Sequence, residues 1–68
     1  MNKVRIAGSL ENTDDDFFVT INTEKGEVIG RLLKFEHIED NTLVEAIGYL
    51  KRNVIDGNIF YIEELKKI

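Results

Sequence analysis

Residues 40–62, which read DNTLVEAIGYLKRNVIDGNIFYI, decide the fold of this 68-residue chain, because their first half fits two different structures. As a helix, it would begin with a capping box formed by Thr42 and Glu45. Its apolar stripe would then consist of Leu43, Ala46, Ile47 and Leu50. As a strand, it would place on one face Val44, Ala46, Gly48 and Leu50, and on the other Glu45, Tyr49 and Lys51.

The Asp56-Gly57 pair favours the strand. An Asp-Gly pair between two runs of β-forming residues is a strong local signal for a hairpin. A hairpin needs an extended segment on each side of its turn, so we expect residues 41–52 to form a strand that pairs with residues 58–62. The sequence therefore predicts an all-β chain, and one short helix around residues 41–52 is the alternative.

The first half of the chain alternates apolar and polar residues with a period of two, which is typical of strands with one buried face. We predict strands at residues 3–10, 17–22 and 27–33, with a polar turn at residues 11–16. Residues 23–26 provide a short hairpin connection that ends in Gly26. The isolated Gly30 predicts a bulge or a bend. The side chains expected to point inward from the first two strands are Val4, Ile6, Leu10, Phe17, Val19 and Ile21.

Length and composition indicate a small folded protein. Sixty-eight residues leave room for one core, so residues 1–68 are predicted to form a single domain. Hydrophobic residues make up 43% of the chain and charged residues 32%, a globular balance. With no Cys and one His, disulfides and a structural metal are not expected, so stability must come from packing or from self-association. The initial Met1 favours a complete chain.

Charge and hydropathy exclude several classes of function. The formal net charge of −4 repels phosphate at long range and argues against non-specific duplex binding. A local basic face can still act within a Debye length of about 8–10 Å. The apolar runs fall far short of the roughly 18 residues that a membrane span needs, so no membrane association is expected. No apolar segment follows the charged start of the chain, so we predict no secretory signal and a cytoplasmic location.

The order of the predicted strands resembles the OB-fold. The first strand, Val4-Arg5-Ile6-Ala7-Gly8, has the form V-x-I-x-G, the strands around Gly26 look like the second and third, and residues 44–50 with 59–62 look like the closing pair. The resemblance implies a small five-stranded barrel, although alternation punctuated by Gly also fits an SH3-like barrel. An OB barrel usually carries a helix between strands three and four, whereas residues 34–41 are too short and polar for more than one turn. We therefore expect a trimmed or incomplete barrel.

The sequence contains no complete set of catalytic or metal-binding residues. Ser9 and His37 are the only residues of their types, and they lie in different segments outside any recognised motif. The spacing of Asn12, Asp14 and Asp16 suits a calcium loop, but Phe17 and Thr23 stand where an EF-hand needs Gly and Glu. Carboxylate pairs such as Glu63-Glu64 are expected to be solvated, and no cofactor-binding motif is present. The sequence therefore predicts a protein that is not an enzyme and has no metal and no cofactor.

The remaining candidates are binding residues. Three aromatic side chains are predicted to face away from the core, and basic residues could flank them; the full set is Phe18, Tyr49, Tyr61, Arg5, Arg31, Lys51 and Arg52. Single-stranded bases stack on aromatic rings beside cations, and OB-like barrels commonly bind such strands. We expect a non-enzymatic module that binds single-stranded nucleic acid. One alternative is a protein-interaction module or small regulator that can form a homodimer. The other is a barrel whose outer aromatic side chains are simply covered by packing.

Overall fold

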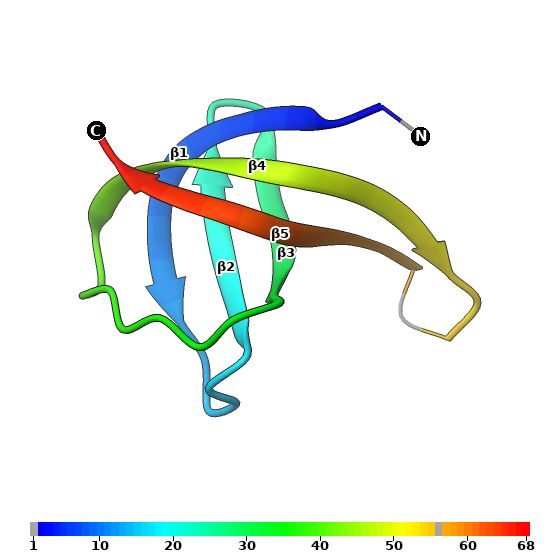
Figure 1. Cartoon of the computed structure of the whole chain (residues 1–68), viewed down its shortest axis with the longest axis horizontal. Helices are drawn as coiled ribbons and strands as arrows, with labels where there is room; N and C mark the ends of the chain where they lie inside the picture. The colour runs from blue at the N-terminus through cyan, green and yellow to red at the C-terminus, as the bar shows by residue number, and fades with distance from the viewer. Residues whose placement is uncertain (1, 56) are drawn as a thin grey trace.

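The alternation of apolar and polar side chains produces five strands in the computed structural model, which describes residues 2–55 and 57–68. The strands are β1 (Val4–Asn12), β2 (Phe18–Thr23), β3 (Gly26–Leu32), β4 (Thr42–Asn53) and β5 (Gly57–Lys67). They close a barrel in the order β1-β2-β3-β5-β4, with β1 and β4 completing the ring (Figure 1). The predictions of an all-β chain and of an OB-like barrel are confirmed.

One of the strand pairs in the barrel is parallel. β3 and β5 run in the same direction, with Gly30 opposite Phe60, Arg31 opposite Tyr61 and Leu32 opposite Ile62. The other four pairings are antiparallel. β1 is long enough to pair with β4 along residues 4–10 and with β2 along residues 9–12. Strands far apart in the sequence are therefore neighbours around the barrel.

The helical alternative for residues 41–52 is wrong, because both parts of the apparent capping box have other partners. The Thr42 hydroxyl donates a hydrogen bond back to the carbonyl of Glu39 (2.7 Å), and the Glu45 carboxylate accepts one from the guanidinium of Arg5 (3.2 Å). The described residues contain no helix, and hence none long and apolar enough to cross a membrane.

The hairpin signal at residues 56–57 predicted the correct pairing. The β4–β5 ladder continues to Asn53 opposite Gly57, and Gly57 has a φ of 78°, the left-handed region that Gly tolerates best. Asp56, the other half of the signal, lies outside the described residues. The end of this hairpin extends beyond the barrel (Figure 1), and we call residues 50–55 and 57–59 the arm.

A register shift lies in the β4–β5 ladder. Ile47 is opposite Glu64, whereas Gly48 is opposite Ile62, so β5 carries one extra residue at this point. A Cβ atom on Gly48 would lie 1.8 Å from the carbonyl oxygen of Tyr61, which shows how closely the two backbones approach. The β2–β3 register runs through Gly30 without a shift, so the bulge predicted there is absent. A Cβ on Gly30 would meet the Cδ1 atom of Ile62 instead, at 2.6 Å.

The barrel interior holds most of the apolar residues whose inward direction was predicted. The cluster consists of Leu10, Val19, Ile21, Leu32, Ile38, Val44, Ala46, Phe60 and Ile62. Ile38 comes from the connection after β3, so this segment supplies core material without forming a helix. The barrel is trimmed as expected, but it is closed rather than incomplete.

Three inward predictions are wrong at the ends of the strands. Val4 and Phe17 are 41% and 40% exposed, and Phe17 precedes β2 and packs edge-on against Phe35, with ring centroids 6.2 Å apart. Leu50 is 51% exposed because β4 has left the barrel there and entered the arm. Ile47, just before the register shift, is buried although strict alternation placed it outward.

Candidate functional site

Four of the predicted binding residues form one continuous row across the barrel. Phe18 of β2 is opposite Arg31 of β3, Arg31 is opposite Tyr61 of β5, and Tyr61 is opposite Tyr49 of β4. All four side chains are half-buried, and their neighbours along the strands, apart from Leu50 where β4 enters the arm, are buried, namely Val19, Gly30, Leu32, Gly48, Phe60 and Ile62. Because side chains alternate between the faces of a strand, the four residues lie on the outer face. We call them the aromatic row.

Cations lie over two of the rings. The guanidinium carbon of Arg31 is 5.3 Å from the centroid of the Phe18 ring, and the Lys51 ammonium is 5.2 Å from that of Tyr61. These distances are within the range of favourable cation–π contacts. Lys51 and Arg52 are exposed on β4 where it enters the arm. The row therefore combines ring faces with positive charge from β3 and β4.

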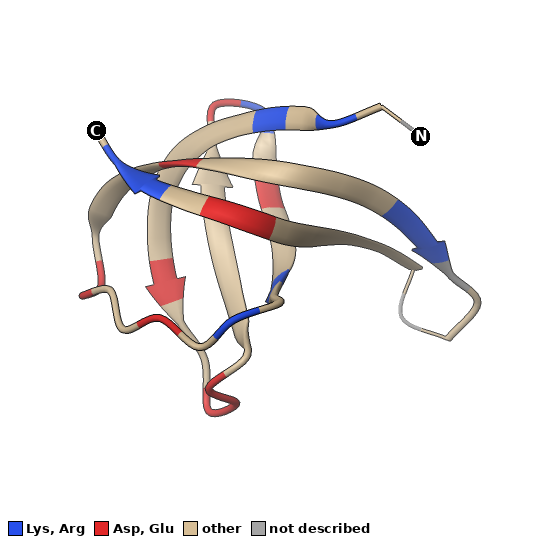
Figure 2. Cartoon of the chain, in the orientation of Figure 1, with Lys and Arg blue, Asp and Glu red and all other residues tan. Residues whose placement is uncertain are grey.

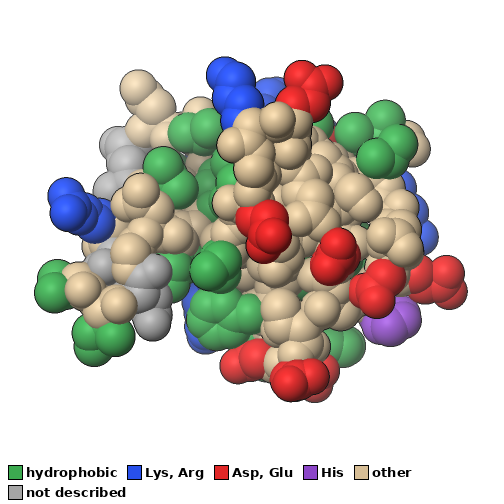
Figure 3. Space-filling model, turned by 180° about the vertical axis from the view of Figure 1, so that it is seen from behind, with side chains coloured by type: hydrophobic (Ala, Val, Ile, Leu, Met, Phe, Trp, Pro, Cys, Tyr) green, Lys and Arg blue, Asp and Glu red, His purple; other side chains and the backbone are tan. Residues whose placement is uncertain are grey.

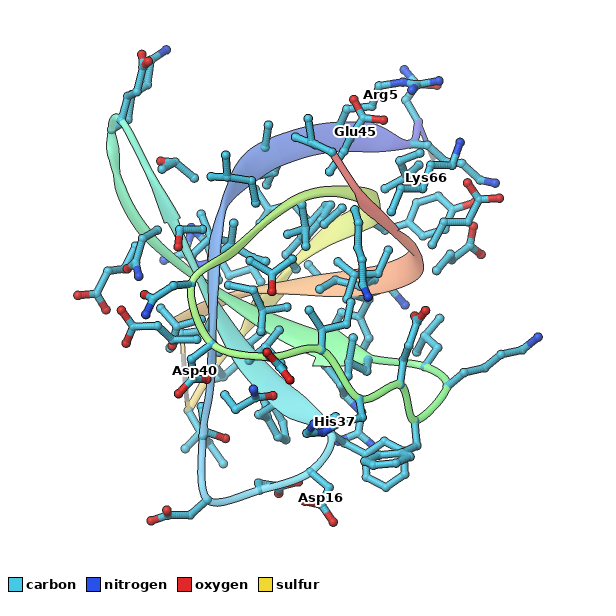
Figure 4. All side chains as sticks on the ribbon, turned by 90° about the vertical axis from the view of Figure 1, so that its left-hand side faces the viewer. Arg5, Asp16, His37, Asp40, Glu45 and Lys66 are labelled. Carbon is cyan, nitrogen blue, oxygen red and sulfur yellow. The ribbon has the colours of Figure 1, made fainter. Side chains whose placement is uncertain are left out.

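Arg5 lies outside this arrangement. It is opposite Ile47 on the β1–β4 ladder, and its guanidinium is paired with the Glu45 carboxylate at 3.2 Å (Figure 4). Within residues 2–55 and 57–68 the only other salt bridge joins Lys3 to Glu63, at 3.0 Å. In that part of the chain, Arg31, Lys51 and Arg52 thus have no carboxylate within salt-bridge distance. The sequence grouped all four predicted cations together, but the structure places two of them, Arg31 and Lys51, over rings of the row. Arg5 is paired with Glu45, and Arg52 follows Lys51 along β4, so its side chain starts from the opposite face of the strand.

An acidic turn bounds the row at its β2 end. The Thr13 hydroxyl donates a hydrogen bond to the carbonyl of Phe18 (2.8 Å), so the turn after β1 lies directly beside the start of β2. Asp14, Asp15 and Asp16 follow in this turn, and all three are exposed. Figure 2 shows the ribbon of this turn in red at the bottom of the molecule and the blue Lys and Arg segment of β4 in the arm. The β2 end of the row is therefore acidic, whereas the cations lie over the rings of the row and along β4.

The other end of the row is bounded by the Lys3–Glu63 pair. Lys3 precedes Val4, which is opposite Gly48, so Lys3 lies beside Tyr49. The hydrogen bond and the charge of Glu63 raise the pKa of the Lys3 ammonium, and the Tyr49 hydroxyl adds a smaller effect in the same direction. Lys3 was not among the predicted binding residues, although it immediately precedes the V-x-I-x-G strand. Its charge is matched by a carboxylate, so the row ends there without a free cation.

A shallow cavity of about 350 Å³ lies between the acidic turn and the connection after β3. Its lining includes Asp16, His37 and Asp40, which Figure 4 labels, and the face seen in Figure 3 carries Asp and Glu side chains toward the same end. Two N–H groups of Asn12, from its backbone (2.8 Å) and its side-chain amide (2.9 Å), donate to the Asp40 carboxylate and lower its pKa. The same amide donates to the carbonyl of Ile38 (2.7 Å).

The calcium-like spacing of Asn12, Asp14 and Asp16 does not produce a recognisable metal centre. Asn12 turns its amide nitrogen to Asp40 and Ile38, as a clamp between β1 and the connection after β3. No group of three or more His, Cys, Asp or Glu residues suited to a metal ion occurs in the described part of the chain. Ser9 lies in β1 between Asn22 and Leu43, whereas His37 is exposed in the connection.

The sequence matches no protein-family model, and no curated protein is significantly similar to it. The function is therefore inferred from the geometry of the aromatic row and from the charges around it.

Proposed function

We propose that this protein is a non-enzymatic module that binds single-stranded nucleic acid across the aromatic row. The observation that carries the proposal is the consecutive pairing of Phe18, Arg31, Tyr61 and Tyr49 on four neighbouring strands. Bases stack both on aromatic rings and on guanidinium planes, and the row presents three of the former and one of the latter.

The dimensions of the row suit a short strand that runs across the barrel. Neighbouring strands are about 4.8 Å apart, so four positions span about 14 Å. Arg31 covers part of one ring and Lys51 part of another, so bases would stack on the guanidinium and on the ring surface that remains open. Phosphates beside those bases would lie within a Debye length of both cations.

The charge distribution supports a single strand in preference to a duplex. The formal net charge of −4 opposes the many phosphates of a double helix, whereas Arg31, Lys51 and Arg52 attract a few phosphates locally. Stacking on the row also requires bases that are not paired with a second strand. The proposal includes a location in the cytoplasm.

Fluorescence anisotropy with a 5′-labelled hexathymidylate tests the proposal. Replacing Phe18 by alanine removes a stacking surface worth about 1–3 kcal/mol, so Kd should rise by about 5-fold to 150-fold. Arg31→Gln should also weaken binding. Arg5→Gln is the matched control, since it removes the same charge from a residue already paired with Glu45. If three phosphates are neutralised, the slope of log K against log salt should be about −2.

Two results would refute the proposal. One is the absence of binding at 20 mM salt, where electrostatic attraction is strongest. The other is an equal loss of affinity in Arg31→Gln and Arg5→Gln, which would mean that the oligonucleotide responds to total charge and not to the row.

Self-association is a second candidate function, favoured by the apolar turn of the arm. Val54 and Ile55 are 100% and 91% exposed, which is unusual for two adjacent apolar side chains. If a second copy of the chain covers them, sedimentation velocity at 100 μM should show a dimer that Val54→Ser/Ile55→Ser abolishes. A monomer at that concentration would exclude this candidate.

A further inference from the structure

We infer that the acidic turn at residues 13–17 limits the length of strand that the aromatic row accepts, so that the protein selects a short single-stranded segment of about four nucleotides. The inference rests on the proposed function and adds the substrate class. It concerns the turn as a repulsive boundary of the row and not as a binding site.

The acidic turn lies next to the Phe18 end of the aromatic row. An oligonucleotide that runs along the row passes Tyr49, Tyr61 and Arg31 and then reaches Phe18 at the start of β2. The next position around the barrel is Thr13, whose hydroxyl donates to the Phe18 carbonyl at 2.8 Å. An oligonucleotide that continues in this direction therefore passes over the acidic turn.

The turn carries three exposed carboxylates, which repel phosphate. Asp14, Asp15 and Asp16 are exposed, and in the described part of the chain none of them has a Lys or Arg within salt-bridge distance. Phosphates that pass over the turn would face three carboxylates within a Debye length of about 10 Å at 0.1 M salt. The cations that favour binding, Arg31 and Lys51, lie over the rings of the row, so the attraction ends where the turn begins.

The length of the row sets the number of nucleotides that can stack on it. A stacked strand rises about 3.4 Å per nucleotide, so a row of about 14 Å holds about four nucleotides. This value lies at the lower limit of the roughly 4–16 nucleotides that OB folds occupy. Beyond Tyr49 the Lys3 charge is matched by Glu63, so the opposite end offers little attraction for a longer strand.

The variant that tests the boundary is Asp14→Asn/Asp16→Asn. These two side chains make no hydrogen bond within the described structure, whereas the Asp15 carboxylate accepts one from the Phe17 amide (2.9 Å) and is therefore kept. The matched control is Glu24→Gln/Glu27→Gln, which removes the same charge from the far end of β2 and β3. Glu27 is four residues from Arg31 along β3, about 13 Å away and beyond the Debye length at 0.1 M salt.

The ligands are tetrathymidylate and the same four nucleotides extended by four abasic nucleotides at both ends. Only four bases are present in each, so the longer oligonucleotide gains no additional binding registers, and one extension must cross the turn whichever way the strand lies. At 0.1 M salt the extended oligonucleotide should bind the natural sequence at least about 3-fold more weakly than tetrathymidylate. The difference should become smaller in Asp14→Asn/Asp16→Asn, where Asp15 is the one carboxylate left in the turn, and should be unchanged in the control variant.

Equal or tighter binding of the extended oligonucleotide by the natural sequence would overturn the inference and leave the proposed function intact. The inference would also be overturned if the difference in affinity between the two oligonucleotides became smaller in the control variant, because the effect would then come from total charge. If neither oligonucleotide binds any of the three proteins, the proposed function is refuted and the inference with it.

Discussion

Replacing Gly48 by alanine adds one methyl group at the point where β4 and β5 approach most closely. The new Cβ would lie 1.8 Å from the Tyr61 carbonyl oxygen, 2.8 Å from its carbonyl carbon and 3.1 Å from the Ile62 Cα. All three are backbone atoms, so no side-chain rotation relieves the contact. The two strands must separate at the register shift.

The cost can be estimated from this geometry. Overpacking by a methyl group costs about 1–3 kcal/mol, and separating the strands weakens about two ladder hydrogen bonds worth about 1 kcal/mol each. The sum is about 3–5 kcal/mol. A 68-residue chain has a total stability of about 3–10 kcal/mol, so Gly48→Ala should leave the protein largely unfolded or lower its Tm by more than about 12 °C.

Thermal and urea unfolding followed by far-ultraviolet circular dichroism measures this loss. Gly57→Ala is the control, because nothing lies within 4 Å of its Cβ position and only the φ of 78° is unfavourable. That variant should lose about 1 kcal/mol. If Gly48→Ala is within 1 kcal/mol of the natural sequence, the close approach is incorrect. The pairing of Tyr49 with Tyr61 would then be in doubt too, since an unshifted register would set Tyr49 opposite Ile62.

Three further predictions concern the connection after β3 and the core. Asn41 has a φ of 68°, so Asn41→Ala should cost about 1 kcal/mol and lower Tm by about 4–8 °C, whereas Asn41→Gly should not; equal melting of the two variants would contradict this. The pKa of Asp40 is lowered in the folded state, so its contribution to stability is complete above pH 4 and is lost as the pH falls further; melting curves between pH 2 and 6 should show a smaller acid loss in Asp40→Asn, and parallel losses would refute the role of its bonds to Asn12. Gly30→Ala should be destabilising and partly rescued by Ile62→Val, which removes the clashing Cδ1 atom; additive losses in urea unfolding would show that the two sites are not in contact.

The alternation of side chains and the turn residues were enough to predict the strands. Two adjacent signals disagreed at residues 42–57, and the turn ending at Gly57 was the better guide because a hairpin constrains both of its strands, whereas a capping box concerns one end of a helix. Thr42 and Glu45 have the right residue types for such a box but find partners at Glu39 and Arg5. The Arg5 contact spans 40 residues of sequence, which local patterns do not show.

The register shift between β4 and β5 and the burial of Ile38 were not predicted. The sign of the extra residue is a change of phase in β5, because the partly buried Leu65 lies three positions after the buried Ile62, but a pairing predicted only as far as Ile62 does not reach it. Ile38 is a single apolar residue in a polar segment, and such a residue has no periodicity to indicate burial. Both features depend on contacts between distant segments, which exist only once the barrel has closed.

The site was predicted in part. Alternation gave the outward direction of Phe18, Tyr49 and Tyr61, but their alignment depends on the parallel β3–β5 pair, which the sequence does not reveal. That pair places Arg31 between Phe18 and Tyr61. Arg5 was grouped with the other cations because charge alone could not show its pairing with Glu45.

Chemical-shift mapping tests the central claim most directly. In a titration of the ¹⁵N-labelled protein with tetrathymidylate, the largest amide shifts should fall on the aromatic row and its neighbours in β2, β3, β4 and β5, with smaller shifts at Lys51. Shifts confined to the arm turn at Val54, or to the cavity beside His37, would place the ligand elsewhere and contradict the account.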